Sequence, residues 1–284
     1  LQLQTLKSFE WIIVDDGSTD ETYKYLKSLR DPRIKIIKQS NQGCNAARNR
    51  GELEINAEFV VYIDSDDELA EPDTLQKMVD RIRQTPTSIG GIAFAVLSPD
   101  RITSLSSIEH DGLLIDYKDL LCGRRVKGDF FRIYKTSAIK VAPWPSNYAG
   151  LEVLKHLAIA KKFKVLYVRE PGLIYHQNHG ENITSAKGTI ARATSMAEGY
   201  EHLISEYKSD FLSFCPKALG LNLFHLAMYS ALAGSDRKAF KHSIRSLRAN
   251  GPWWKNILLV ASLSVSLSIR HAAFTWRSSL KGKS

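Results

Sequence analysis

The chain has few cysteines, no cysteine spacing typical of a metal site, and no long apolar run. Its 284 residues include three cysteines, Cys44, Cys122 and Cys215, which lie far apart and form no CxxC or Cys/His pattern. This spacing argues against a zinc site and favours a reducing compartment. The most apolar stretch, residues 256–269, is shorter than the roughly 20 residues that a membrane-spanning helix needs. Serines interrupt it, so we expect a buried or interfacial helix there.

The chain also lacks an excess of acidic residues, since 39 Lys and Arg outnumber 30 Asp and Glu to give a formal charge of +9. This balance suits anionic partners such as nucleotides, phospholipid headgroups or nucleic acid. The basic residues are scattered through the sequence rather than arranged in stripes with exposed aromatics, so no nucleic-acid partner is expected.

Short β-branched and aromatic runs alternate with helical patterns in the first two thirds of the chain. Such alternation predicts an α/β fold with a mostly parallel sheet flanked by helices. The expected strands are 11–14, 33–39, 58–64, 90–97, 164–168 and 171–178, and residues 130–139 are expected to form a strand followed by a helix. Residues 98–127 show no clear pattern and predict a long loop or insertion. From residue 188 nearly everything is helical, so we expect an α/β domain over 1–187 and a helical C-terminal region over 188–284.

Acidic side chains follow two of the predicted strands directly. Asp15 and Asp16 end the first, and Asp64, Asp66 and Asp67 end the third. Ligands of open α/β sheets bind beyond the carboxyl ends of strands, so if these strands are neighbours the five carboxylates surround one crevice. A divalent cation bound to substrate phosphates would offset their repulsion. The alternative is that they only cap helices, as Asp and Ser often do.

Three motifs, "EWIIVDDGSTDET", "NQGCNAARNRG" and "EFVVYIDSDDELAEPD", in this order and spacing resemble the family 2 glycosyltransferases of the GT-A fold. The likeness extends over roughly residues 1–185. It implies the transfer of a sugar, with inversion, from a nucleotide-sugar, most simply a UDP-sugar, to an acceptor hydroxyl. It also implies Mn²⁺ or Mg²⁺ as a cofactor.

The resemblance assigns roles to the acidic residues and to one arginine. Asp16 lies where the family binds the nucleotide base, and Asp15 stands beside it. Asp64 and Asp66 match the family's DxD motif, with Asp66 near the ribose. Arg48 lies where the family places a basic residue near the nucleotide, although a helix-surface arginine would look the same in sequence.

The same resemblance implies a metal site. Asp66 or Asp67 would bind the metal, and His179 falls on a family histidine that contacts metal or diphosphate; a loop histidine without a role is the alternative. His176 stands where the family usually has an arginine.

The catalytic base departs from the family's pattern. The family's Glu-Asp pair is replaced by Leu151 and Glu152, which leaves Glu152 as the expected base. The alternative is an acid that only complements the dipole at the start of a helix. Trp144 is expected either to line the acceptor pocket or to lie in the core.

The family's domain begins with an apolar strand ending in a Pro-x-Tyr-Asn type motif, for which this sequence has no match. We expect the sequence to be a fragment. A non-catalytic scaffold with a vestigial nucleotide site is the alternative function, and a nucleotidyltransferase is a further one, although no Gly-rich phosphate loop is visible.

Family acceptors are often glycans or lipid-linked saccharides of the cell envelope. Trp, Lys and Arg residues flank the apolar stretch of the C-terminal tail, as in helices at a membrane–water interface. These features predict a cytoplasmic protein with peripheral contact at the inner face of the cell membrane.

Overall fold

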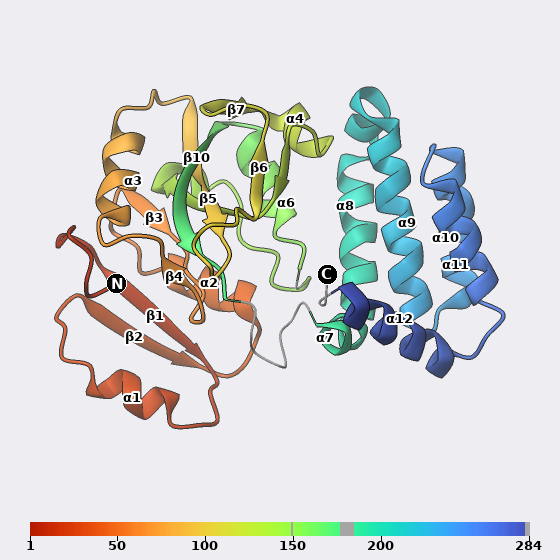
Figure 1. Cartoon of the computed structure of the whole chain (residues 1–284), viewed down its shortest axis with the longest axis horizontal. Coiled ribbons are helices and arrows are strands. Elements are labelled where there is room, and N and C mark those ends of the chain that lie inside the picture. The colour runs from red at the N-terminus through yellow and green to blue at the C-terminus, as the bar shows by residue number, and fades with distance from the viewer. Residues whose placement is uncertain (149, 177–184, 282–284) are drawn as a thin grey trace. The chain divides into compact units, whose positions relative to one another are not determined.

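The structure is a computed structural model that describes residues 1–148, 150–176 and 185–281. The chain divides into two compact units (Figure 1). Unit 1 comprises Leu1–Ser146 and Glu152–His176, and unit 2 comprises Asn147–Leu151 and Gln177–Ser284.

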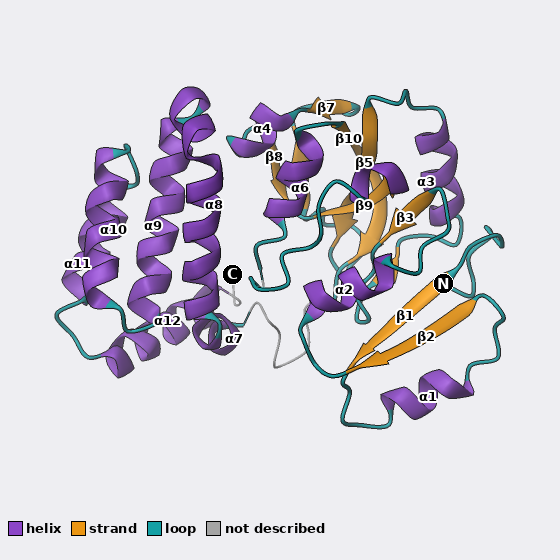
Figure 2. Cartoon of the chain, turned by 180° about the vertical axis from the view of Figure 1, so that it is seen from behind, coloured by secondary structure: helices purple, strands orange, loops and turns teal. Residues whose placement is uncertain are grey.

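Unit 1 is an α/β unit built on a six-stranded sheet with helices packed against it (Figure 2). The strand order is β3-β9-β5-β10-β4, with β7 also paired to β10. The strands are β3 (Phe59–Val61), β4 (Glu68–Leu69), β5 (Ile89–Leu97), β7 (Leu113–Ile115), β9 (Phe130–Lys135) and β10 (Lys164–Ile174). The helices of the unit are α1 (Thr22–Ser28), α2 (Cys44–Glu52), α3 (Thr74–Arg83), α4 (Tyr117–Leu121), α5 (Thr136–Ile139) and α6 (Val153–Ala160).

Strand β5 lies centrally between β9 and β10, which explains its nearly continuous apolar sequence IGGIAFAVL. Helix α3 buries Leu75, Met78 and Ile82, at the spacing of one helical face, in the core beside Phe94. The six-stranded sheet is mixed, so the expectation of a mostly parallel sheet is wrong in this respect. Strand β5 is parallel to β10 but antiparallel to β9.

The two strands that precede the acidic clusters are not neighbours. Strand β1 (Trp11–Asp16) forms a separate parallel pair with β2 (Ile34–Gln39), whereas β3 is hydrogen-bonded to β9. Within the described residues, β1 and β3 share no backbone hydrogen bonds, so the sequence-based adjacency is wrong. Helix α2 packs against β1 instead: a Cβ on Gly51 would lie 3.5 Å from a methyl carbon of Val14.

The segment 98–127 is more regular than its sequence predicts. It contains β6 (Ser106–Ile108), which pairs with β8 (Val126–Gly128), together with β7 and α4. Each of these elements is only three to five residues long. Elements this short span less than two periods of a helix pattern, so no periodicity was available to predict them.

Unit 2 is helical. Helices α8 (Ala193–Phe214), α9 (Pro216–Leu232) and α10 (Asp236–Arg248) lie side by side, with α9 packed between the other two (Figures 1 and 2). The remaining helices are α7 (Ala186–Ala191), α11 (Trp253–Ser262) and α12 (Leu267–Lys281). In the described part of the chain no helix is both long and apolar enough to cross a bilayer.

Candidate active site

Asp16 fixes the loop that leads into α2. Its Oδ2 accepts a hydrogen bond from the backbone N–H of Gly43 at 2.7 Å, and its Oδ1 accepts from Gln42 N–H and the Gln39 amide. Gly43 has φ 89°, a left-handed conformation that glycine adopts without strain. Asp16 therefore places the start of α2 directly beyond the end of β1.

Asp15 is buried at the same strand end. Its Oδ1 accepts a hydrogen bond from Ser18 N–H at 2.8 Å. The Ser18 side chain first, and then this backbone hydrogen bond, lower the pKa of the carboxyl group against the opposing effect of burial. Its other oxygen, Oδ2, is buried and has no hydrogen-bond partner among the residues that the structure describes. A buried carboxylate oxygen without a partner is costly, so a ligand N–H that reached it would stabilise the site.

Arg48, one and a half turns into α2, joins this end of β1 to the second acidic cluster. Its guanidinium donates to Asp64 Oδ1 at 2.8 Å and also to Asn45 Oδ1 at 3.3 Å. The alternative of a solvated surface arginine is excluded, because only 20% of the Arg48 side chain is exposed. Asp16 and Asp64 thus contact the same short helix at points about 8 Å apart along its axis, at a rise of ~1.5 Å per residue.

Glu152 lies close to the same helix. Burial is the main reason why the pKa of Cys44 is raised; Glu152 and Asp64 add to this effect and Arg48 opposes it. Glu152 also acts electrostatically on Arg48. Asp16, Asp64 and the expected base Glu152 therefore all act on residues of the first half of α2 or its cap.

The second cluster sits on the turn after β3, where Asp67 N–H donates to Asp64 O at 3.2 Å. Asp64 and Asp66 are exposed, while Asp67 is partly buried and accepts a long, 3.4 Å hydrogen bond from His176 N–H. Burial, together with repulsion from Asp64 and Asp66, raises the pKa of Asp67 to about 6. A bound cation would relieve this repulsion.

These residues could hold a divalent metal only together with the substrate, which would supply the remaining ligands. No group of three or more His, Cys, Asp or Glu residues positioned to hold a metal occurs within 1–148, 150–176 and 185–281. Mg²⁺ and Mn²⁺ commonly take one or two carboxylates and complete their shell with substrate phosphates and water. Asp66 and Asp67 can supply those carboxylates. His179 lies outside the described residues, and His176 is instead near Glu68, with Nε2 3.5 Å from Oε2.

Trp144 is buried, so its expected place in an acceptor pocket gives way to the core alternative. Its ring lies between two cations, with the guanidinium of Arg48 5.0 Å and the ammonium of Lys155 4.8 Å from the ring centre. Asn49 holds the backbone of Trp144 through two hydrogen bonds of 2.7 and 2.9 Å.

Sequence reasoning missed a polar centre beneath the site. Glu52 Oε1 accepts hydrogen bonds from the Tyr62 hydroxyl at 2.5 Å and from Trp144 Nε1 at 2.7 Å, and it is paired with Lys155. The Lys155 side chain is fully buried. The cluster joins the end of α2, Tyr62 directly after β3, and the helix α6, whose first turn follows Glu152. Nothing in the sequence around Glu52 distinguishes it from a solvated helix acid.

We expect Glu52→Ala to destabilise the protein by about 3–5 kcal/mol, because removing one partner leaves the buried Lys155 uncompensated. Urea denaturation measures this change. The matched control is Glu54→Ala, which removes more exposed ion pairs with Lys35 and Arg50 and should cost less than about 1 kcal/mol. The double variant Glu52→Ala/Lys155→Met should recover much of the loss; equal destabilisation by the single and double variants would contradict the role of the pair.

His156 makes the stability of this region sensitive to acid. Its Nδ1 is 2.9 Å from the Tyr134 hydroxyl; burial, and then the nearby Arg132, Arg48 and Lys155, lower the pKa of the imidazole well below its usual value of 6.5. The unfolded chain therefore takes up a proton near pH 6.5 that the folded protein does not, and the free energy of unfolding falls as the pH drops below 6.5.

We expect His156→Asn, whose amide oxygen can accept the same hydrogen bond, to show a smaller loss of melting temperature between pH 7 and pH 5 than the parent protein. Melting curves at both pH values test this. Equal losses in the two proteins would show that His156 does not set the acid response.

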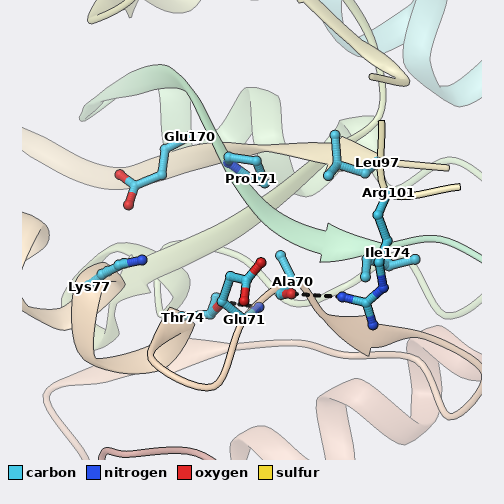
Figure 3. Close-up of a pocket in the computed structure, with 9 residues that line it drawn as sticks. All are labelled: Ala70, Glu71, Thr74, Lys77, Leu97, Arg101, Glu170, Pro171 and Ile174. Atoms are coloured by element: carbon cyan, nitrogen blue, oxygen red, sulfur yellow. Dashed lines mark hydrogen bonds between the residues drawn. The ribbon is translucent and has the colours of Figure 1, made fainter. Parts of the chain in front are cut away.

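A cavity of about 230 Å³ lies elsewhere in unit 1, between the start of α3 and the end of β10 (Figure 3). Its walls include Glu71, Lys77, Arg101 and Glu170, and Arg101 donates to Ala70 O at 3.1 Å. None of the expected site residues lines it. Its mixed charges give no reason to prefer it over the acidic cluster around α2.

Comparison with known proteins agrees with this architecture. Residues 1–141 match the model of the family described as "Glycosyl transferase family 2". The GalNAc(5)-diNAcBac-PP-undecaprenol beta-1,3-glucosyltransferase of Campylobacter jejuni is 26% identical over 93% of this chain and 86% of its own length. An uncharacterised glycosyltransferase of Nostoc is 27% identical over 74% and 68%, respectively.

A solved structure, that of a mycobacterial protein, covers 66% of this chain and 63% of its own with a TM-score of 0.42 and 16% identity, a likeness too weak to carry an argument. The family match covers the elements that bear Asp16, Arg48 and the Asp64–Asp67 turn, and the C. jejuni likeness extends through most of the chain. The chain therefore belongs to glycosyl transferase family 2 and is a glycosyltransferase.

Proposed function

We propose that this protein transfers a sugar from a nucleotide-sugar, most simply a UDP-sugar, to a hydroxyl of a lipid-linked saccharide, with inversion at the anomeric carbon. The observation that carries the proposal is the convergence of Asp16, Asp64 and Glu152 on the first half of α2. This arrangement supports a single site that combines nucleotide-binding groups with a general base.

The nucleotide-sugar donor is bound through its base by Asp15 and through its diphosphate by Arg48. The free Oδ2 of Asp15 accepts a hydrogen bond from the base, which requires a donor N–H on the base such as that of uracil. Asp16 is already engaged by the loop before α2, so its role is to hold that loop rather than to bind the base alone. Arg48 stands beside Asp64, where it can also face a diphosphate.

Glu152 takes the proton of the acceptor hydroxyl as that oxygen attacks the anomeric carbon. The bond from the anomeric carbon to the nucleoside diphosphate breaks on the opposite face, and the diphosphate leaves with the bonding electrons. Mn²⁺ or Mg²⁺ bound at Asp66 and Asp67 would supply charge neutralisation for that leaving group. General-base catalysis of this kind typically contributes about 10²–10⁴-fold.

The C. jejuni relative, which aligns with nearly the whole chain, is named for an undecaprenol-linked oligosaccharide acceptor. That name supports an acceptor of the same chemical class here, a saccharide carried on a lipid diphosphate. Such an acceptor would place the reaction at the inner face of the cell membrane.

Calorimetric titration of UDP and UDP-sugars, with and without Mn²⁺, tests the donor site. We expect binding that strengthens when Mn²⁺ is present, and release of UDP from a UDP-sugar when a lipid-linked saccharide is added. An absence of metal-dependent heat for every nucleotide-sugar would refute the proposal and favour a non-catalytic scaffold.

A further inference from the structure

Helices α11 and α12 in unit 2 bury polar residues and expose large apolar ones, the reverse of an ordinary amphipathic helix. The one residue of α11 that is buried is polar, Asn256. Large apolar side chains on the two helices are exposed instead: Trp253 (67%), Trp254, Ile257, Leu258 (61%), Ile269 and Trp276 (67%). We refer to these six residues as the α11–α12 face. Soluble proteins seldom leave so many large apolar side chains together in water.

Polar groups hold the two helices against the rest of unit 2. Asn256 donates to Ser246 Oγ at 3.0 Å, and that hydroxyl donates to Gly220 O at 2.7 Å, so α11, α10 and α9 are joined. In α12, the buried Arg270 forms a bidentate pair with Asp236, with N–O distances of 2.6 and 3.1 Å. Because these contacts hold the polar sides of α11 and α12 against unit 2, the apolar sides of both helices face outward.

The net positive charge of the chain is concentrated in the C-terminal segment that contains α11 and α12. The last 48 residues, 237–284, contain ten Lys and Arg and no Asp or Glu. The preceding 236 residues contain 29 basic and 30 acidic side chains, so the whole positive excess of the protein belongs to this C-terminal segment. Lys255 neighbours the α11–α12 face, with its ammonium 5.4 Å from the Trp254 ring centre.

We propose that the α11–α12 face binds the surface of a membrane that contains anionic lipid. Tryptophan favours the boundary between headgroups and acyl chains, and exposed Ile and Leu would enter the apolar edge of the bilayer. The cations of 237–284 other than Arg270, which is already paired with Asp236, would be attracted to the negative headgroups. A symmetric contact between two copies would bring two such cationic segments together, and like charges disfavour it. This inference does not depend on the proposed transfer reaction.

The test uses the full chain and vesicles of phosphatidylcholine with or without about 30% phosphatidylglycerol, because anionic lipid should govern the attraction. We expect co-sedimentation with the anionic vesicles, a blue shift of tryptophan fluorescence, and little binding to pure phosphatidylcholine. Raising the salt concentration should weaken the binding. The variant Ile257→Asp/Leu258→Asp should reduce partitioning by about 10-fold or more, since charges enter the acyl boundary at high cost.

The matched control is Leu212→Asp/Leu221→Asp, which changes two exposed leucines of α8 and α9 and should leave vesicle binding unchanged. Circular dichroism of each variant confirms that it is folded. Binding that is independent of anionic lipid, or equally reduced in both variants, would overturn the proposal. A lack of vesicle binding together with dimers that Ile257→Asp/Leu258→Asp dissociates would overturn it in favour of self-association.

Discussion

The double variant Asp66→Ala/Asp67→Ala is expected to lose sugar transfer by about 10³-fold or more, because it removes both carboxylates that can hold a metal next to the donor diphosphate. The dependence of donor binding on Mn²⁺ should disappear with it. Initial rates of UDP release, measured at saturating donor and acceptor, give the size of the effect.

This loss can be distinguished from unfolding. Burial and the neighbouring carboxylates raise the pKa of Asp67 to about 6, so its charge at pH 7 opposes folding. Its replacement should leave the melting temperature at pH 7 unchanged or raise it. Asp80→Ala, on the exposed side of α3, is the control and should retain full activity. Unaltered turnover in the double variant would remove the metal site from this turn.

The second large effect is expected for Glu152→Gln, which should lower kcat by about 10²-fold or more while donor binding is kept. The amide retains the size of the side chain but cannot take up a proton. Glu152 lies at the start of α6, near Arg48 and Cys44 but on a different element from the donor-binding carboxylates. Donor affinity, measured calorimetrically, should change less than about threefold, which is under 1 kcal/mol.

Glu152→Asp provides the contrast, since it keeps the carboxylate but shortens its reach by one methylene. We expect it to retain more activity than Glu152→Gln, with a pH profile of the same shape. If Glu152→Gln turns over at a nearly normal rate, the base is another residue and Glu152 serves only the helix start.

The sequence predicted individual elements better than their arrangement. The expected strands at 11–14 and 90–97 correspond to β1 and β5, because β-branched and apolar runs are local properties of the sequence. Their arrangement depends on pairings between distant segments, which a single sequence does not record. For this reason the adjacency of β1 and β3 and the mostly parallel sheet were wrong, although the α/β class with a helical C-terminal region was confirmed.

A similar limit applies to the site. The acidic residues were found because two clusters each follow an apolar run, which is visible in sequence. The ion pair of Arg48 with Asp64 and the burial of Lys155 against Glu52 could not be found, since each joins residues 16 or more positions apart. The roles assigned to Asp15, Asp66 and Glu152 remain predictions that the variants above test.

The position of Trp144 between Arg48 and Lys155 has a kinetic consequence. One ring contacts cations from both α2 and α6, so a shift of Arg48 changes the surroundings of a ring that Lys155 also faces. A donor diphosphate that draws Arg48 toward itself would therefore also shift the turn that carries Glu152. We expect an ordered kinetic mechanism, in which the nucleotide-sugar binds first and the acceptor binds only after the Glu152 carboxylate is correctly oriented.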